Sequence, residues 1–117
     1  MRYSDSLKKN KDFQLVYRYG TSKANKYLVM YVRKNHTDEN RIGISVSKKV
    51  GNSVVRHHLT RLIRESYRLL EESFRRGIDV VIIVRVNDCT YHEIERAIYH
   101  LGKLHHVIGK KNEDDIN

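Results

Sequence analysis

Hydrophobic residues near the start of the chain recur at the spacing of an α-helix. Phe13, Val16 and Tyr17 are three or four positions apart or adjacent, so they fall on one helical face. Asn10 precedes them as a candidate N-cap. The pattern predicts a first helix over residues 11–19.

Two later segments, residues 27–33 and 41–47, alternate between apolar and other side chains as half-buried strands do. The side chains predicted to face the core are Leu28, Met30, Val32, Ile42, Ile44 and Val46. We also expect a short extended segment over residues 21–25 before both strands.

The second half of the chain begins with a long helical pattern over residues 53–75, closed by Gly77. Residues 78–85 are apolar on both faces, which is typical of a central strand covered on both sides. Thr90 and Glu93 form a capping box at the start of a last helix. That helix is expected to end at Gly109 and to bury Ile94, Ile98, Leu101, Leu104 and Ile108.

These elements predict an α+β fold in which helices pack on a small mixed sheet. We expect one domain over residues 1–109 and a flexible polar tail over residues 110–117. The strand at 41–47, the long helix and the strand at 78–85 form a β-α-β unit. The general rule makes such a crossover right-handed.

Composition narrows the class of protein. The chain has 117 residues, and Leu, Ile, Val and Phe make up about 28% of them, which is enough for a packed core. We expect no membrane span, since the longest apolar run is far below ~20 residues, and the N-terminus lacks the apolar stretch of a secretory signal. The single cysteine, Cys89, allows no internal disulfide. A cytoplasmic protein is therefore expected.

The charge is distributed unevenly. The formal net charge is +9, of which residues 1–68 carry +11 and the remainder −2. A surface charged only for solubility would mix the two signs along the chain, so this asymmetry favours a face that binds a polyanion.

Much of this charge lies on one side of the predicted long helix. At 100° per residue, Leu59 and Ile63 face the core, and an almost one-signed polar face lies opposite. That face contains Arg56, His57, Thr60, Arg61, Arg64 and Arg68. A simple solvated face is the usual alternative, but arginines four positions apart repel each other, which favours a bound anion. Lys48 and Lys49 precede the helix N-terminus, where backbone N–H groups suit a phosphate.

A second candidate surface lies on the strand at 27–33. Tyr27, Val29 and Tyr31 lie opposite the core-facing residues, and Ser45 and Ser47 stand on the equivalent face of the next strand. Aromatic rings beside small side chains suit stacking with single-stranded nucleic acid. The same tyrosines could instead form ordinary core beneath the first helix.

Catalytic chemistry is not evident in the sequence. His57-His58 and His105-His106 are adjacent pairs whose side chains point in different directions, and His92-Glu93 lacks the second histidine of a zinc-protease motif. We therefore expect no catalytic residue and no metal site in this chain.

The residues from Ser47 to Arg56, followed by Arg61-Leu62-Ile63-Arg64-Glu65, resemble the arginine-rich signature of the bacterial ribonuclease P protein subunit. The resemblance extends back to residues 7–20 and 41–47 and forward to 79–85, and covers most of residues 7–100 in order and spacing. It implies an α-β-β-β-α-β-α sandwich of the ribosomal protein S5 domain 2-like type. It also implies a left-handed β-α-β crossover, against the general rule.

The resemblance implies a protein subunit of a ribonucleoprotein endoribonuclease that cleaves precursor tRNA and leaves a 5′-phosphate on the mature tRNA. Catalysis is then carried out by the RNA subunit with Mg²⁺ that this RNA binds. The implied partners are the ribonuclease P RNA subunit and precursor tRNA, with no membrane and with a monomeric free protein.

The resemblance also implies two sets of site residues. The residues expected to bind the catalytic RNA are Lys48, Lys49, Asn52, Arg56, His57, His58, Arg61, Arg64 and Arg68. The residues expected to bind the precursor-tRNA leader are Phe13, Tyr17, Val29, Tyr31, Ser45 and Ser47, with additional phosphate contacts from Arg18, Lys23 and Lys26.

The chain departs from the family pattern at three positions. His57, His58 and Thr60 stand where the family usually has Asn, Arg or Lys, and Lys, so two cations are absent at neutral pH. A ribosomal or ribosome-assembly RNA-binding protein is the main alternative, because the same fold and charge would serve it. A peripheral membrane protein is less favoured, since the long helix buries its apolar face in the core and the chain has no Trp.

Overall fold

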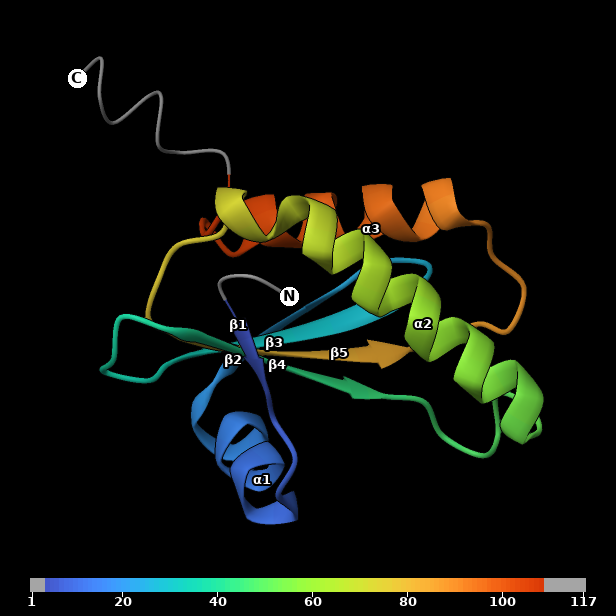
Figure 1. Cartoon of the computed structure of the whole chain (residues 1–117), viewed down its shortest axis with the longest axis horizontal. Coiled ribbons are helices and arrows are strands. Elements are labelled where there is room, and N and C mark those ends of the chain that lie inside the picture. The colour runs from blue at the N-terminus through green and yellow to red at the C-terminus, as the bar shows by residue number, and fades with distance from the viewer. Residues whose placement is uncertain (1–3, 109–117) are drawn as a thin grey trace.

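A five-stranded mixed sheet with helices on both faces forms the structure, a computed structural model that describes residues 4–108 (Figure 1). The elements in chain order are β1 (Ser4–Ser6), α1 (Asn10–Tyr19), β2 (Thr21–Ala24), β3 (Leu28–Lys34), β4 (Asn40–Ser45), α2 (Ser53–Leu70), the 3₁₀-helix η1 (Glu71–Ser73), β5 (Ile78–Val84) and α3 (Tyr91–Leu104). The α+β class and the mixed sheet are therefore confirmed. None of the described helices is long and apolar enough to cross a membrane.

The strand β5 lies in the middle of the sheet, whose order is β1-β4-β5-β3-β2. It pairs antiparallel with β3, from Leu28 opposite Val84 to Lys34 opposite Ile78, and parallel with β4. All of its side chains except that of Ile83 are buried. The apolar segment 78–85 is therefore a central strand covered on both faces, as the sequence predicts.

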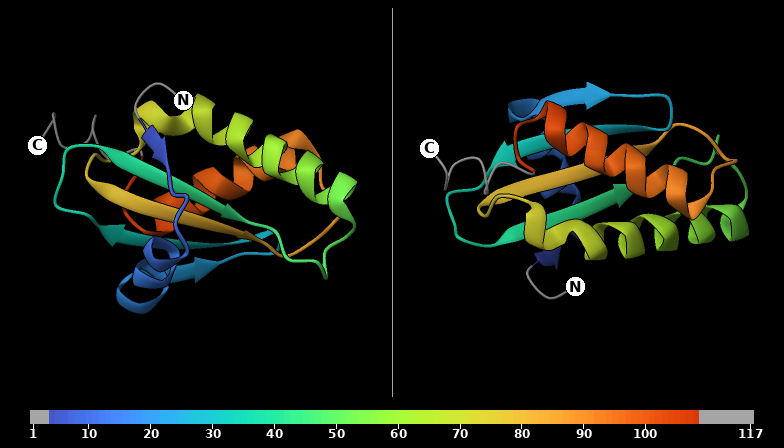
Figure 2. Two further views of the ribbon diagram at one scale, coloured as in Figure 1. Left: turned by 60° about the horizontal axis from the view of Figure 1, so that its bottom comes forward. Right: turned by 90° about the horizontal axis from the view of Figure 1, so that it is seen from above.

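The two faces of the sheet carry cores of different size. Between the sheet and the pair α2 and α3 lies the larger core, in which Leu59, Ile63, Tyr67, Ile94, Ile98 and Leu101 are the main helical contributions. On the other face, α1 covers a small cluster built on Leu7, Val16 and Val81. Figure 2 shows α1 alone on its face, opposite α2 and α3.

The crossover from β4 through α2 to β5 joins two neighbouring parallel strands. Viewed from the side of α2 with the strands pointing upward, the chain moves to the left from β4 to β5 (Figure 2). The crossover is therefore left-handed. This confirms the handedness implied by the family resemblance, and the general right-handed rule does not hold here.

Several predicted boundaries are wrong. Asn10 is the first residue of α1 and not its N-cap; the cap position is Lys9, which makes no side-chain capping bond. The long helix ends at Leu70 and not at residue 75. Two glutamates follow at 71 and 72, where negative charge interacts unfavourably with the helix dipole. Phe74 then adopts an extended conformation, forms a β-bridge with Ile108 and packs on the Tyr67 ring.

The last helix also ends earlier than expected. It stops at Leu104, which is 41% exposed and not buried. Ile108 is buried, but as the bridge partner of Phe74 beyond the helix. The capping box of Thr90 and Glu93 is confirmed. The predicted stop at Gly109 and the tail at 110–117 lie outside the described residues.

The carboxylate of Asp79 on β5 is fully buried and is the centre of an ionic cluster. It accepts hydrogen bonds from Arg41 Nε at 2.9 Å, Arg41 Nη2 at 2.7 Å and Asn35 Nδ2 at 2.9 Å, and Arg33 lies 3.6 Å away. Burial alone would raise the pKa of Asp79, but the hydrogen bonds from Arg41 and Asn35 and the charges of Arg41 and Arg33 outweigh it and lower that pKa. The cluster therefore ties β3, β4 and β5 together through side chains.

We predict that Asp79→Asn destabilises the protein by roughly 2–4 kcal/mol, because Arg41 loses its two close hydrogen bonds and keeps only the looser ion pair with Asp12 at 3.7 Å. In wild type this contribution is complete above the unfolded-chain pKa of about 3.9 and is lost as the pH falls through the lower folded value. Urea unfolding of both proteins between about pH 3 and 7 measures it. The exposed Asp38→Asn serves as control. Equal unfolding midpoints for the Asp79 and Asp38 variants at neutral pH would contradict the account.

Candidate nucleic-acid interface

The helix α2 separates its apolar and basic sides as the sequence predicts. Its buried residues are Leu59, Ile63, Ser66 and Tyr67. The exposed basic residues on the remaining surface are His57, His58, Arg61, Arg64 and Arg68. These five residues form what we call the α2 basic face. Figure 1 shows that α2 lies at the outside of the fold along its whole length.

Arg56 and Thr60 lie at the margin of the α2 basic face, because both are only partly exposed. The Thr60 hydroxyl donates to the Arg56 carbonyl at 2.9 Å, a bond back to the preceding helical turn. The Arg56 Nε is buried without a hydrogen-bond partner among the described residues. Arg56 is thus less available to a ligand than Arg61 or Arg64.

Two arginines of the α2 basic face have partners within the chain. Arg64 Nη1 lies 3.4 Å from the Ser6 hydroxyl on β1, a weak bond at most. Arg68 pairs with Glu65 three positions earlier, and this hydrogen bond lowers the pKa of Glu65. Arg64 therefore has no carboxylate partner among the described ion pairs, whereas the charge of Arg68 is partly neutralised.

The loop between β4 and α2 presents Lys48 and Lys49, both exposed, at the N-terminus of the helix. Its turn is closed by the Val50 N–H, which donates to the Ser47 carbonyl at 3.0 Å. Asn52 is the N-cap of α2, and its side-chain oxygen accepts the Val55 N–H at 3.0 Å. Asn52 is exposed, so its side chain is accessible at the start of the helix.

On the opposite face of the sheet, three aromatic rings lie between α1 and β3. The Tyr17 and Tyr31 rings meet edge to face with centroids 5.0 Å apart, and the Phe13 ring lies 6.4 Å from Tyr17. All three are partly buried and pack against the cluster of Leu7, Val16 and Val81. We call this set of rings the α1 aromatic surface. The rings therefore cover a small core beneath α1, and part of their surface remains exposed.

Small residues of β4 continue the α1 aromatic surface. A Cβ added at Gly43 would lie 2.7 Å from the Phe13 ring, so that ring rests directly on the strand backbone. Burial raises the pKa of Tyr17, and a hydrogen bond with Ser45 opposes this rise. Ser47 lies exposed beyond the end of the strand. Ser45 and the Tyr17 ring therefore lie next to each other, as the sequence predicts.

The remaining residues expected at this surface differ in position. Val29 is partly buried on β3, opposite Ala24 and Ile83. Arg18, Lys23 and Lys26 are exposed. The assignment of Tyr27 to this face is wrong. Tyr27 precedes β3, packs against the larger core and donates to Glu93 Oε2 of α3 at 2.8 Å.

The strand β1, a neighbour of the α2 basic face, was not predicted from the sequence. The strand β1 pairs with β4, and its Ser4 hydroxyl lies 2.9 Å from the Tyr67 hydroxyl of α2. Three residues are too few for a periodic signal, and both partners are remote in sequence. Within residues 4–108, no group of three or more His, Cys, Asp or Glu residues is placed to hold a metal ion.

A protein-family model described as ribonuclease P matches residues 1–105. The chain belongs to the ribonuclease P protein family. It is 55% identical over 113 residues to the ribonuclease P protein component of Lachnoclostridium phytofermentans, covering 95% of this chain and 97% of the relative. It is 50% identical to that of Clostridioides difficile, covering 83% and 88%.

Solved structures of ribonuclease P proteins share the fold. The Staphylococcus aureus protein aligns with a TM-score of 0.81 at 38% identity, covering 93% of this chain and 100% of that one. The Thermotoga maritima protein aligns with a TM-score of 0.77 at 29% identity, covering 85% and 96%. Family membership gives the chain a role in processing the 5′ ends of tRNA, as a component of the ribonuclease P endoribonuclease.

We predict that Gly43→Ala destabilises the protein by roughly 1–3 kcal/mol, because its methyl group must displace the Phe13 ring from the sheet. Urea unfolding followed by circular dichroism measures the change. Ser22→Ala on the exposed strand β2 is the control and should change stability by no more than about 0.5 kcal/mol. If the Gly43→Ala variant were as stable as wild type, the close packing of the Phe13 ring on the β4 backbone would not contribute to stability.

Proposed function

We propose that this chain is the protein subunit of ribonuclease P, with one RNA-binding surface on each side of the sheet. The α2 basic face, together with Lys48, Lys49, Asn52 and Arg56, binds the catalytic RNA. The α1 aromatic surface, with Val29, Ser45 and Ser47, binds the single-stranded 5′ leader of precursor tRNA. The observation that carries this proposal is the placement of a predominantly basic helix face and a partly exposed aromatic surface on opposite faces of one sheet.

Separation of the two surfaces allows two RNA segments to be bound at the same time. The helix α2 covers one face of the sheet and α1 the other, so neither RNA needs to displace the other. The loop that carries Lys48 and Lys49, which we call the lysine loop, lies between them, since it connects the end of β4 to the start of α2. This loop is suited to contact phosphates where the two RNAs approach each other.

In this proposal the protein contributes binding and positioning. Arginines of the α2 basic face neutralise phosphates of the catalytic RNA, which lowers backbone repulsion and thereby the Mg²⁺ concentration that the RNA needs to fold. Tyrosine rings stack with leader bases, each stack contributing about 1–3 kcal/mol without sequence preference. Mg²⁺ held by the RNA subunit would supply the activated water for hydrolysis, and the protein needs no metal ligands of its own.

Family membership favours this function over that of a ribosomal RNA-binding protein. The deciding experiment adds the purified protein to a bacterial ribonuclease P RNA and precursor tRNA at low Mg²⁺. Stimulated cleavage at the 5′ end of the mature tRNA is expected. Selective binding to ribosomal RNA without such stimulation would instead support the alternative.

We predict opposite effects for two neighbouring substitutions in α2. Arg64→Gln removes a phosphate-binding charge, so the affinity for the catalytic RNA should fall several-fold and the log–log salt slope should become about 1 less steep. Glu65→Gln removes the partner of Arg68, so the affinity should rise. Filter binding between about 50 and 300 mM salt measures both, with a wild-type slope near −4 to −5 for about six phosphate contacts.

The matched control for these substitutions is Arg96→Gln, which makes the same charge change at an exposed position of α3. Its affinity and salt slope should remain close to those of wild type. A slope near zero in wild type, or equal losses for Arg64→Gln and Arg96→Gln, would contradict the assignment of the α2 basic face.

We predict that Tyr31→Leu selectively weakens substrates with a long leader. The substitution keeps an apolar side chain over Val81 but removes the ring, so affinity should fall by roughly fivefold or more, corresponding to ~1 kcal/mol of stacking. Holoenzyme binding to precursor tRNAs with leaders of one and of about ten nucleotides measures this effect. The same loss for both substrates would exclude the α1 aromatic surface as the leader site.

A further inference from the structure

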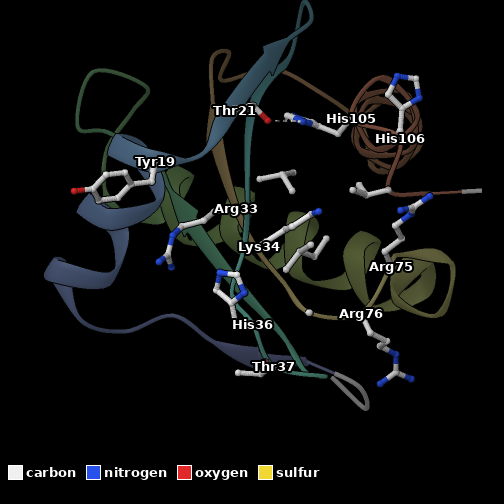
Figure 3. Close-up of a pocket in the computed structure, with 14 residues that line it drawn as sticks. Tyr19, Thr21, Arg33, Lys34, His36, Thr37, Arg75, Arg76, His105 and His106 are labelled. Carbon is white, nitrogen blue, oxygen red and sulfur yellow. Dashed lines mark hydrogen bonds between the residues drawn. The ribbon is translucent and has the colours of Figure 1, made fainter.

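A basic pocket lies at the end of the sheet where β3 ends and β5 begins (Figure 3). It has a volume of about 710 Å³. Its charged lining comes from Arg33 and Lys34 of β3 and from Arg75 and Arg76 before β5. Figure 3 shows Lys34 reaching across the space between Arg33 on one side and Arg75 on the other. The pocket is at the opposite end of the sheet from Ser45 and the lysine loop, because β4 and β5 are parallel.

The pocket is positively charged overall. The residues that line it include four arginine or lysine side chains and no carboxylate. The charge of Arg33 is partly neutralised by the buried Asp79, 3.6 Å away, so the positive charge that faces the pocket comes mainly from Lys34 and Arg75. Other acids in adjoining segments are Asp38, Glu39, Glu71 and Glu72, none of which lines the pocket. Cations gathered in a concave site focus a positive field and favour a bound anion.

Three histidines complete the lining, namely His36, His105 and His106. The His105 ring is held in place, with Nε2 at 2.8 Å from the Met30 carbonyl and Nδ1 at 3.4 Å from the Thr21 hydroxyl. Since a carbonyl can only accept, Nε2 carries the proton in this arrangement. Burial lowers the pKa of His105, so at neutral pH it acts as an oriented polar group and not as a fixed charge.

The backbone around this pocket is unusual. Within residues 4–108 the residues with positive φ are His36 at 60°, His106 at 60° and Gly77 at 86°, and all three line the pocket. His106 follows α3 at the position where a helix commonly ends in glycine, and its neighbour Val107 donates back to Gly102. A left-handed backbone conformation is strained for a non-glycine residue, although histidine is among the residues found there more often. Such strain gathered at one site is typical of a functional site.

We propose that this pocket binds a nucleotide of RNA through its phosphate, as a third RNA contact of the protein. The proposal rests on the function proposed above for the chain. Arginine and lysine side chains are suited to a phosphate, and the volume leaves room for the attached sugar and base. Tyr19, which is 63% exposed at the rim, offers a ring on which a base can stack. The catalytic RNA and the precursor-tRNA leader could each supply this nucleotide.

The direct test is a titration of the free protein with adenosine 5′-monophosphate, followed by NMR of the histidine side chains. Saturable shifts are expected at His36, His105 and His106, and adenosine without phosphate should produce none. The double variant Lys34→Gln/Arg75→Gln should weaken binding at least fivefold. The control Lys11→Gln/Arg96→Gln loses the same charge at exposed positions outside the pocket and should bind as wild type does.

Equal binding by the two double variants, or equal shifts with adenosine alone, would overturn the proposal. The melting temperatures of both double variants should match that of wild type, because the four replaced side chains are exposed. If they match, a loss of binding reports the pocket and not unfolding.

Two further measurements identify the RNA. Weaker binding of the double variant to the ribonuclease P RNA alone would assign the pocket to the catalytic RNA. A defect that appears only with long-leader precursor tRNA would assign it to the leader. Unchanged binding in both assays would overturn the assignment to RNA. The Arg64→Gln variant is measured in the same assays. If Arg64→Gln also leaves RNA binding unchanged, the proposed function fails together with the pocket assignment.

Discussion

Burial of β5 on both faces is the constraint on which the rest of the structure depends. A strand whose side chains are buried and, except for Asp79, apolar is stable only if both sides of the sheet are covered, so α2 and α3 pack on one side and α1 on the other. This arrangement uses the apolar stripe of α2 for the core and leaves its arginines outside. It also leaves α1 to cover its face alone, which is why the rings beneath it are only partly buried. The two proposed RNA surfaces therefore follow from the way in which one strand is covered.

Local patterns in the sequence were sufficient for most of the fold. Helical and strand periodicity located the main elements, and the capping box of Thr90 and Glu93 was predicted correctly because it depends on two residues three positions apart. The errors arose where distant contacts decide. The chain does not continue α2 to residue 75, because Phe74 is buried against Tyr67 and forms a β-bridge with Ile108. Three-residue β1 depends on β4, and Tyr27 is turned toward α3 by Glu93, a partner 66 positions away.

The candidate sites likewise divide into features that local sequence patterns predict and features that depend on distant contacts. The α2 basic face could be predicted because a helix places residues at fixed angles, whatever packs on its other side. The partial burial of Tyr17 and Tyr31 could not, since it depends on how closely α1 approaches the sheet at Gly43. The pocket containing Lys34, Arg75 and His106 was not foreseen at all, because its lining comes from segments that are separate in sequence. No local pattern joins them.

The strand order also affects how this protein is made. Among the described strands, the pairs β1–β4 and β3–β2 are joined only through β5, which is the last of them to be synthesised. A nascent chain that has emerged only as far as Gly77 therefore lacks the strand that unites its two halves, although the basic segment of α2 is already complete. Until β5 emerges, the apolar stripe of α2 has no finished core to cover, and its arginines are presented to the RNA-rich surface of the ribosome. Transiently exposed apolar surface of this kind makes an incompletely folded chain prone to aggregate.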